Sequence, residues 1–307
     1  MKIAVLVMAT EQNPSIRNVE AFKNTVVKFC DDNVDKLKHE YTFVFYYAGE
    51  DKKIKENDNI YRFSYNMDES VYRTFEKTRL ALIDTRLIIK PDLYVRVNIS
   101  TYINIVLLDT LAEQIYDSDM IICNKINTHI NNILSPFFNC VYPRGDFMVF
   151  KNDVTDAIVY CGERYMYNNT KMNGIKLGVD HVDDCMIGVC LKDCYGNDYY
   201  KKISTVRYNY VPDKQPDYTE IDLMSIASRI KTVPPNKCSG YSWDDNEYRL
   251  FDVNKFEGLY DIYKNVEYNN DITLNDVLTD NVYQIVFIND SYLSREEYDT
   301  LQKKWSK

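Results

Sequence analysis

The stretch Lys2-Ile3-Ala4-Val5-Leu6-Val7-Met8 is an almost unbroken apolar run of the length of a strand. Such a run predicts a strand buried on both faces, as in a parallel sheet covered by helices. Two further runs, at residues 41–47 (YTFVFYY) and 92–97 (DLYVRV), have the same character. The segments 18–29 and 70–89 between them carry apolar residues at helical spacing. The chain therefore begins as an alternation of strands and helices.

This alternation continues as far as residue 195. We predict short strands at 60–63, 120–123 and 146–150, a polar loop at 52–58, a helix at 102–116 capped by residues 98–101, and another helix from 154. The pattern predicts an α/β domain over residues 1–195, with a mostly parallel sheet flanked by helices. Residues 196–307 are interpreted as a C-terminal extension packed on that domain, with helices at 221–230 and 294–304.

Composition excludes some classes of protein. The chain has 307 residues and a net charge of -9, which argues against a nucleic-acid binder because such a protein needs a basic face. We predict neither a secretory signal nor a transmembrane segment, and therefore expect a cytoplasmic protein. The eight cysteines form no C-x-x-C pair and there are only three histidines, so we expect free buried thiols rather than a zinc site.

Ligands of such sheets bind beyond the carboxyl ends of the strands, which would bring Thr10, Gly49 and Asn98 near one another. Arg96-Val97-Asn98-Ile99-Ser100 is a buried strand that breaks into polar residues, which could contact a ligand or cap a helix. The segment 142–147 (YPRGDF) places Arg144 and Asp146 on either side of Gly145, which permits a close backbone approach or forms an ordinary turn.

An acidic cluster at 179–191 (VDHVDDCMIGVCL) precedes an apolar helical pattern. Asp183 or Asp184 could cap that helix, or one of them could take a proton from an attacking hydroxyl. Trp243-Asp244-Asp245 could form a sugar platform, although a solvated turn is the commoner use of such residues.

Taken in order, these segments resemble the β-1,3-galactosyltransferase and Fringe-type family of inverting, GT-A-type glycosyltransferases. Residues 96–104 (RVNISTYIN) lie over the family's K-x-D-D-D-x-F-x-N strand. Residues 142–150 are similar to its Y-x-x-G-x-x-Y/F segment, and residues 183–191 to its E-D-V-x-x-G-x-x-L motif. Upstream, Lys77-Thr78 matches the end of a D-x-Y-x-N-L-T-x-K-T segment. The resemblance covers residues 1–195 and implies a GT-A-like fold.

The family's three aspartates bind Mn²⁺ and the nucleotide diphosphate, and here they are replaced by Asn98, Ile99 and Ser100. Neutral oxygens are poor ligands for a hard divalent cation. Three alternatives stay open. The enzyme could be metal-independent, with Arg or Lys neutralising the diphosphate; Mn²⁺ or Mg²⁺ could be held elsewhere, by Asp146 or Asp180; or the domain could bind without catalysing.

The resemblance implies an inverting transfer of a hexose from a nucleotide sugar, most simply a UDP-sugar, to a hydroxyl of a glycan or glycolipid. It makes Asp184 the catalytic base, with Asp183 beside it. The expected donor contacts are Thr10, Arg17, Arg96, Asn98, Ser100, Arg144, Gly145 and Asp146. Arg96 or Arg144 would stabilise the departing diphosphate, unless Arg96 forms an ordinary ion pair. The alternative function is a non-catalytic module that binds nucleotide sugar or glycan.

Overall fold

The computed structural model describes residues 1–12, 15–69, 73–130, 140–167, 171–172, 175–176, 183–232, 250–269, 271–280 and 283–287. Its strands are β1 (Lys2–Met8), β2 (Glu40–Gly49), β3 (Lys52–Lys55), β4 (Ile60–Asn66), β5 (Leu93–Asn98), β6 (Thr101–Ile103), β7 (Ile121–Cys123), β8 (Ile126–Ile130), β9 (Cys140–Pro143), β10 (Phe147–Lys151), β11 (Lys171–Met172), β12 (Ile175–Lys176), β13 (Ile203–Val206), β14 (Tyr208–Tyr210), β15 (Ala227–Arg229), β16 (Leu278–Thr279) and β17 (Tyr283–Phe287).

The α-helices are α1 (Ile16–Phe22), α2 (Lys28–Asp32), α3 (Thr74–Ile88), α4 (Ile105–Ser118), α5 (Asn152–Tyr167), α6 (Asp183–Tyr195), α8 (Asp252–Tyr263) and α9 (Leu274–Val277). Helix α1 runs through a π-helical turn, η1 (Lys23–Val27), into α2. Two 3-10 turns, η3 (Tyr199–Lys202) and η4 (Tyr218–Glu220), complete the helical segments of the described chain.

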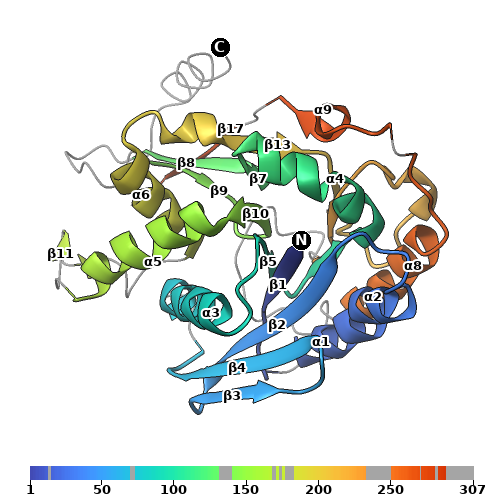
Figure 1. Cartoon of the computed structure of the whole chain (residues 1–307), viewed down its shortest axis with the longest axis horizontal. Helices are drawn as coiled ribbons and strands as arrows, with labels where there is room; N and C mark the ends of the chain where they lie inside the picture. Colours follow the sequence, from blue (N-terminus) through green and yellow to red (C-terminus); the bar gives the residue numbers. More distant parts are fainter. Residues whose placement is uncertain are drawn as a thin grey trace.

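A nine-stranded sheet in the order β16-β13-β7-β10-β5-β1-β2-β4-β3 forms the centre of the molecule (Figure 1). Strands β4, β2, β1, β5, β7 and β13 run in one direction, whereas β10, β3 and β16 run against their neighbours. The expectation of an α/β fold with a mostly parallel sheet flanked by helices is confirmed. The reversed strand β10 is not distinguishable from a parallel strand by its sequence pattern.

The apolar run that opens the chain is explained by the two cores that it joins. Ile3, Val5 and Val7 face one core, which also contains residues of α1, α4 and α8. Ala4 and Leu6 face the other, built with residues of α3, α5 and α6. Because successive side chains of a strand point to opposite faces, a strand between two helical layers must be apolar at every position. Figure 1 shows these two groups of helices on opposite sides of the sheet.

Several local predictions are wrong, and pairing between distant segments explains them. The segment 221–230 was expected as a helix, but it contains β15, which pairs with β14 and β6. The helix expected from residue 102 begins at Ile105, because residues 101–103 are taken into β6 and Asn104 accepts a hydrogen bond from Leu107 N as the helix cap. The loop expected at 52–58 contains the edge strand β3.

Strands from both sides of residue 195 share the main sheet, since β13 pairs with β7. The proposed boundary at residue 195 stays a prediction. The helix expected at 294–304 and the Trp243-Asp244-Asp245 cluster lie outside the described residues.

The cysteines differ in part from the expectation of free thiols. Cys161 of α5 and Cys194 of α6 form a disulfide, which corrects that expectation for these two residues. Cys30, Cys123, Cys140, Cys185 and Cys190 are free and buried, and Cys238 lies outside the described residues.

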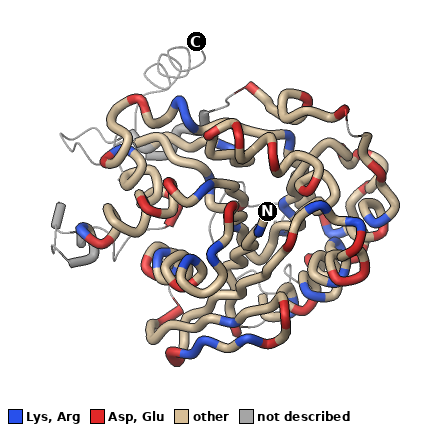
Figure 2. The backbone as a smooth tube through the Cα atoms, viewed as in Figure 1, with Lys and Arg blue, Asp and Glu red and all other residues tan. Residues whose placement is uncertain are grey.

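Acidic and basic residues are interspersed along the elements (Figure 2). In the described part of the chain, no helix has the length and apolar character needed to cross a bilayer.

Candidate functional site

The candidate site lies at the carboxyl edge of the parallel strands, where β1 is flanked by β2 on one side and β5 on the other. Met8 at the end of β1 is paired with Asn98 at the end of β5. The connections that leave β1 and enter β5 carry their helices, α1 and α3, on opposite faces of the sheet. Such a switch point is where ligands bind in open α/β sheets. The reversed strand β10 begins at this same edge, so the turn before it also faces the site.

The acidic pair predicted from the sequence occupies the first turn of α6 at this edge. Asp183 is buried, and its carboxylate accepts hydrogen bonds from Arg96 Nη2 and, at 3.1 Å, from Thr78 Oγ1. Thr78 Oγ1 lies 3.2 Å from the hydroxyl of Tyr46, so a polar chain leads from β2 through α3 to the acidic pair. The Asp183 backbone N–H donates to Thr74 Oγ1. Asp183 is therefore fixed by protein groups on several sides.

Arg96 of β5 is completely buried, which is rare for an arginine and requires compensation of its charge. The ion pair with Asp183 supplies that compensation. Its Nη1 has no hydrogen-bond partner in the described structure and lies beside Gly145. A Cβ atom added at Gly145 would meet this nitrogen at 3.0 Å and the Cβ of Asp184 at 3.4 Å. The turn at Gly145 therefore packs tightly against the buried ion pair, and a larger residue there would require Arg96 to shift by a few tenths of an ångström.

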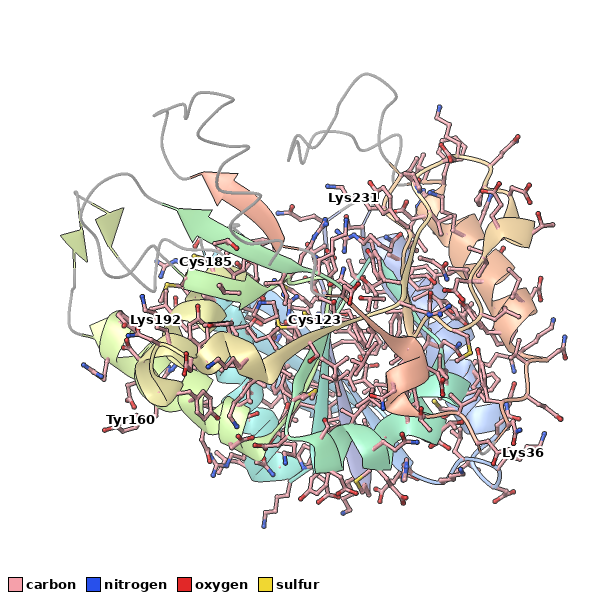
Figure 3. The ribbon with its side chains drawn as sticks, turned by 90° about the horizontal axis from the view of Figure 1, so that it is seen from above. Lys36, Cys123, Tyr160, Cys185, Lys192 and Lys231 are labelled. Atoms are coloured by element: carbon pink, nitrogen blue, oxygen red, sulfur yellow. A yellow bond between two sulfur atoms is a disulfide. The ribbon has the colours of Figure 1, made fainter. Side chains whose placement is uncertain are left out.

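Asp184 differs from Asp183 because it is only partly buried. Its Oδ2 accepts a hydrogen bond from Gly145 N at 3.3 Å, and its Oδ1 accepts one from Cys185 N at 2.9 Å. Cys185, labelled in Figure 3, is the next residue of the first turn of α6 and is buried. Burial, followed by repulsion from the charge of Asp183, raises the pKa of Asp184 to about 7. A carboxyl group with such a pKa can both accept and release a proton near neutral pH.

Lys77 is a second buried cation at this edge, and it was not among the site residues expected from the sequence. Its Nζ donates to Glu69 Oε1 at 2.6 Å and to the Ala9 carbonyl, at the end of β1, at 3.3 Å. Burial lowers the pKa of Lys77, and Glu69 opposes that effect. The signal in the sequence was the match of Lys77-Thr78 to the end of the D-x-Y-x-N-L-T-x-K-T segment.

The turn Arg144-Gly145-Asp146 separates the acidic pair from an arginine cluster. Asp146 is buried, with Arg229 Nη1 at 3.0 Å from its Oδ1 and Arg144 Nε at 2.7 Å from its Oδ2. Burial by itself would raise the pKa of Asp146, but Arg229 and Arg144 outweigh it and hold the pKa below the usual value. Arg229 belongs to β15, in the segment predicted as a helix, so sequence reasoning missed it.

Residues 98–100, for which the resemblance implied a comparison with three metal-binding aspartates, do not fit a divalent cation. Asn98 Oδ1 accepts from both the backbone N and the hydroxyl of Ser100 at 3.3 Å. Ser100 and Ile99 are buried, and Ile99 offers no ligand atom. The nearby Asp146 has both carboxylate oxygens bound to arginines. No group of three His, Cys, Asp or Glu residues suited to a metal occurs in the described ranges, which do not include Asp180.

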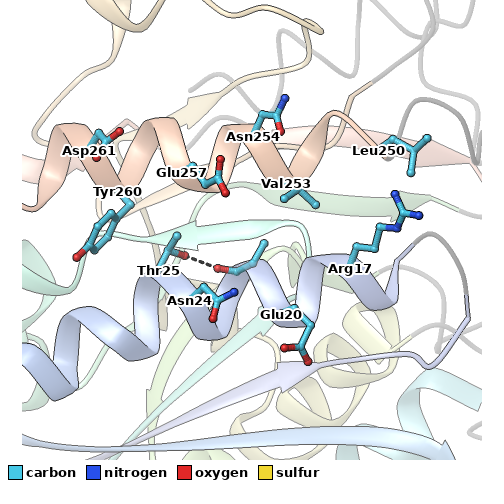
Figure 4. A pocket seen from close by; sticks show the side chains of 11 residues that line it. Arg17, Glu20, Asn24, Thr25, Leu250, Val253, Asn254, Glu257, Tyr260 and Asp261 are labelled. Carbon is cyan, nitrogen blue, oxygen red and sulfur yellow. Dashed lines mark hydrogen bonds between the residues drawn. The ribbon is translucent and has the colours of Figure 1, made fainter.

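Two expected donor contacts, Thr10 and Arg17, follow β1. Thr10 is buried at the end of the strand, and its Oγ1 accepts from Gln12 N at 3.1 Å. Arg17 is exposed and faces a groove of about 650 Å³ between α1 and α8 (Figure 4). Helices α1 and α8 cover the opposite face of the sheet from α6, so the structure does not bring Arg17 together with the acidic pair.

Comparisons with known proteins give similarities of fold alone. No protein-family model and no curated protein sequence matches the chain. The crystal structure of a glycosyltransferase involved in the glycosylation of the major capsid of PBCV-1 has a TM-score of 0.43 at 8% identity, covering 84% of this chain and 100% of that chain. The galactosyltransferase LgtC, in complex with donor and acceptor sugar analogs, has a TM-score of 0.41 at 12% identity, covering 87% of this chain and 98% of that chain.

Proposed function

We propose that the chain is an inverting glycosyltransferase that moves a hexose from a nucleotide sugar, most simply a UDP-sugar, to a hydroxyl of a glycan or glycolipid. The observation that carries this proposal is the carboxyl group of Asp184. It is partly exposed at the ligand-binding edge of the sheet, and its pKa of about 7 suits a general base at neutral pH.

The reaction is a single displacement. The acceptor oxygen forms a bond to the anomeric carbon as the bond from that carbon to the diphosphate oxygen breaks. Asp184 takes the proton of the acceptor hydroxyl, and the nucleoside diphosphate departs with the electron pair of the broken bond. The Gly145 N–H fixes the orientation of the Asp184 carboxylate. Asp183 is held next to Asp184 by Arg96 and Thr78, and repulsion between the two carboxyl groups raises the pKa of Asp184 and so its basicity.

The donor would lie over the carboxyl ends of β1 and β5, against Thr10 and Asn98. Arg96 is assigned to the positioning of Asp183 rather than to the donor, because it is completely buried and paired with that carboxylate. The proposed partners of this activity are a nucleotide sugar and a hydroxyl of a glycan or glycolipid.

The test supplies a panel of nucleotide sugars to the wild-type chain and to the Asp184→Asn variant. Turnover is measured as the release of the nucleoside diphosphate. The variant should bind the donor but lose turnover. Asp198→Asn, which removes an exposed carboxylate paired with Lys201, is the matched control and should keep the wild-type rate. Turnover that persists in Asp184→Asn would refute the role of Asp184. Donor binding without turnover by the wild-type chain would instead indicate the non-catalytic module.

A further inference from the structure

We propose that Arg144 and Arg229, organised by Asp146, form a metal-free binding site for the diphosphate group of the ligand. The inference rests on the proposed function for the identity of that ligand. Residues 98–100 do not fit a divalent cation, because Asn98 Oδ1 accepts hydrogen bonds from Ser100 and the apolar Ile99 is buried. A diphosphate bound at this edge needs positive charge from another source.

The arginine cluster supplies that charge. Two guanidinium groups share one carboxylate, so the three side chains carry a net charge of one positive unit. The pKa of Asp146 lies below its usual value, and the cluster therefore keeps the same charge over the physiological pH range. A divalent cation at Asp146 would have to displace both arginines from the carboxylate oxygens. The geometry thus favours an anion over a metal ion at this position.

The cluster is also preorganised. Arg229 is held by the pairing of β15 with β6, in which it lies opposite Thr101. Its side chain is 8% exposed, whereas that of Arg144 is 27% exposed, so the pair has a buried and a more open member. Guanidinium groups present several N–H donors in a planar fork, which suits the oxygens of a diphosphate. Because Asp146 already holds both side chains, little side-chain freedom remains to be lost on binding.

The location fits the departure of a leaving group. The carbonyl of Asp146 accepts a hydrogen bond from Asn98 N, and Asp146 directly follows Gly145, whose N–H reaches Asp184. The base and the arginine cluster therefore lie on the two sides of one short turn at the carboxyl edge. Developing negative charge on the diphosphate would meet fixed cations that need no reorganisation during the reaction.

The experiment measures the affinity of inorganic pyrophosphate and of UDP by calorimetry, in EDTA and in Mn²⁺. We expect the wild-type affinity in EDTA to be within about threefold of that in Mn²⁺, because no cation is needed. Arg229→Gln and Arg144→Gln should each weaken binding about tenfold, the usual effect of one charge-assisted hydrogen bond. Arg207→Gln, which removes an exposed arginine paired with Asp222, should bind as the wild type does.

A triple variant, Arg144→Gln with Asp146→Asn and Arg229→Gln, separates binding from stability because it leaves no unpaired charge in the cluster. It should fold and lose at least about a hundredfold in affinity. Wild-type affinity in the triple variant, or binding that requires Mn²⁺, would overturn the inference and assign the arginines to a structural ion pair. A wild-type chain that binds pyrophosphate in EDTA but turns over no nucleotide sugar would support the anion site and refute the transferase.

Discussion

The backbone N–H of Gly145 donates a hydrogen bond to Oδ2 of Asp184 at 3.3 Å, which joins the turn before β10 to the first turn of α6. These two elements are far apart in the chain, and each supplies half of the candidate site. On one side of the contact lies the carboxylate that would act as base, and on the other lie Asp146 and its arginines. The turn packs closely here, since a Cβ atom added at Gly145 would lie 3.0 Å from Arg96 Nη1.

Replacement of Asp184 by Asn should lower kcat by about 100- to 10,000-fold, the usual contribution of a general base. Donor affinity should change little, because the carboxylate acts on the acceptor. The measurement is steady-state kinetics together with calorimetric binding of the donor. An equal loss in binding and in kcat would show that Asp184 holds the donor instead.

The rate should depend on pH through the same group. Since the pKa of Asp184 is raised to about 7, kcat/KM should rise with pH below that value and level off above it, as the carboxylate becomes the base form. A pH profile of the wild-type chain, measured over a range in which its circular dichroism is constant, checks this. A profile that is flat between about pH 5 and 8 would contradict the assignment.

The same pKa predicts that stability falls as pH rises, whereas the rate rises with pH. Asp184 has a folded-state pKa of about 7 and a reference value of 3.8, so the folded chain retains a proton that the unfolded chain has lost between these values. The contribution of Asp184 to stability therefore decreases as pH rises through this range. Asp184→Asn should raise the melting temperature at about pH 8 and change it less at about pH 5. A variant that is less stable at the higher pH would show that the ionised carboxylate is well compensated.

The buried ion pair between Arg96 and Asp183 should be costly to break. Arg96→Met would leave the carboxylate of Asp183 buried without its cationic partner, and we expect a loss of about 3–5 kcal/mol in the free energy of unfolding. Urea denaturation measures this loss. Arg86→Met removes one partner of the half-exposed pair with Asp156 and should cost less than about 1 kcal/mol. Similar losses in both variants would contradict the role assigned to burial.

Gly188 permits α6 to approach β9, and its replacement by Ala should move the helix that carries the acidic pair. A Cβ atom there would lie 2.8 Å from the carbonyl oxygen of Val141 and 2.5 Å from the Cβ of Tyr142. We expect Gly188→Ala to destabilise the fold by about 1–3 kcal/mol, as overpacking usually does. Thermal unfolding checks this, with Glu113→Ala on the exposed face of α4 as the control. An unchanged melting temperature for Gly188→Ala would show that α6 can shift freely.

The local sequence pattern was sufficient to predict those strands and helices whose surroundings are the same along their whole length. The run KIAVLVM predicted β1 because a strand between two helical layers is apolar on both faces. The acidic residues in the first turn of α6 were recognised for a similar reason. Where a helix enters a core, the sequence changes from polar to apolar residues after its first turn. Asp183 and Asp184 could therefore be named as candidates before their surroundings were known.

Tertiary contacts decided what those candidates are. Asp183 and Asp184 are adjacent residues of the same type. Asp183 is paired with the buried Arg96, whereas Asp184 is partly exposed and has a raised pKa. Arg229 was missed because the apolar spacing around it is compatible with a helix, while pairing with β6 and β14 makes the segment a strand. The sequence by itself determined which residues can be buried or charged. Only the tertiary structure decided their partners, because ion pairs, desolvation and strand pairing join residues that are distant in the chain.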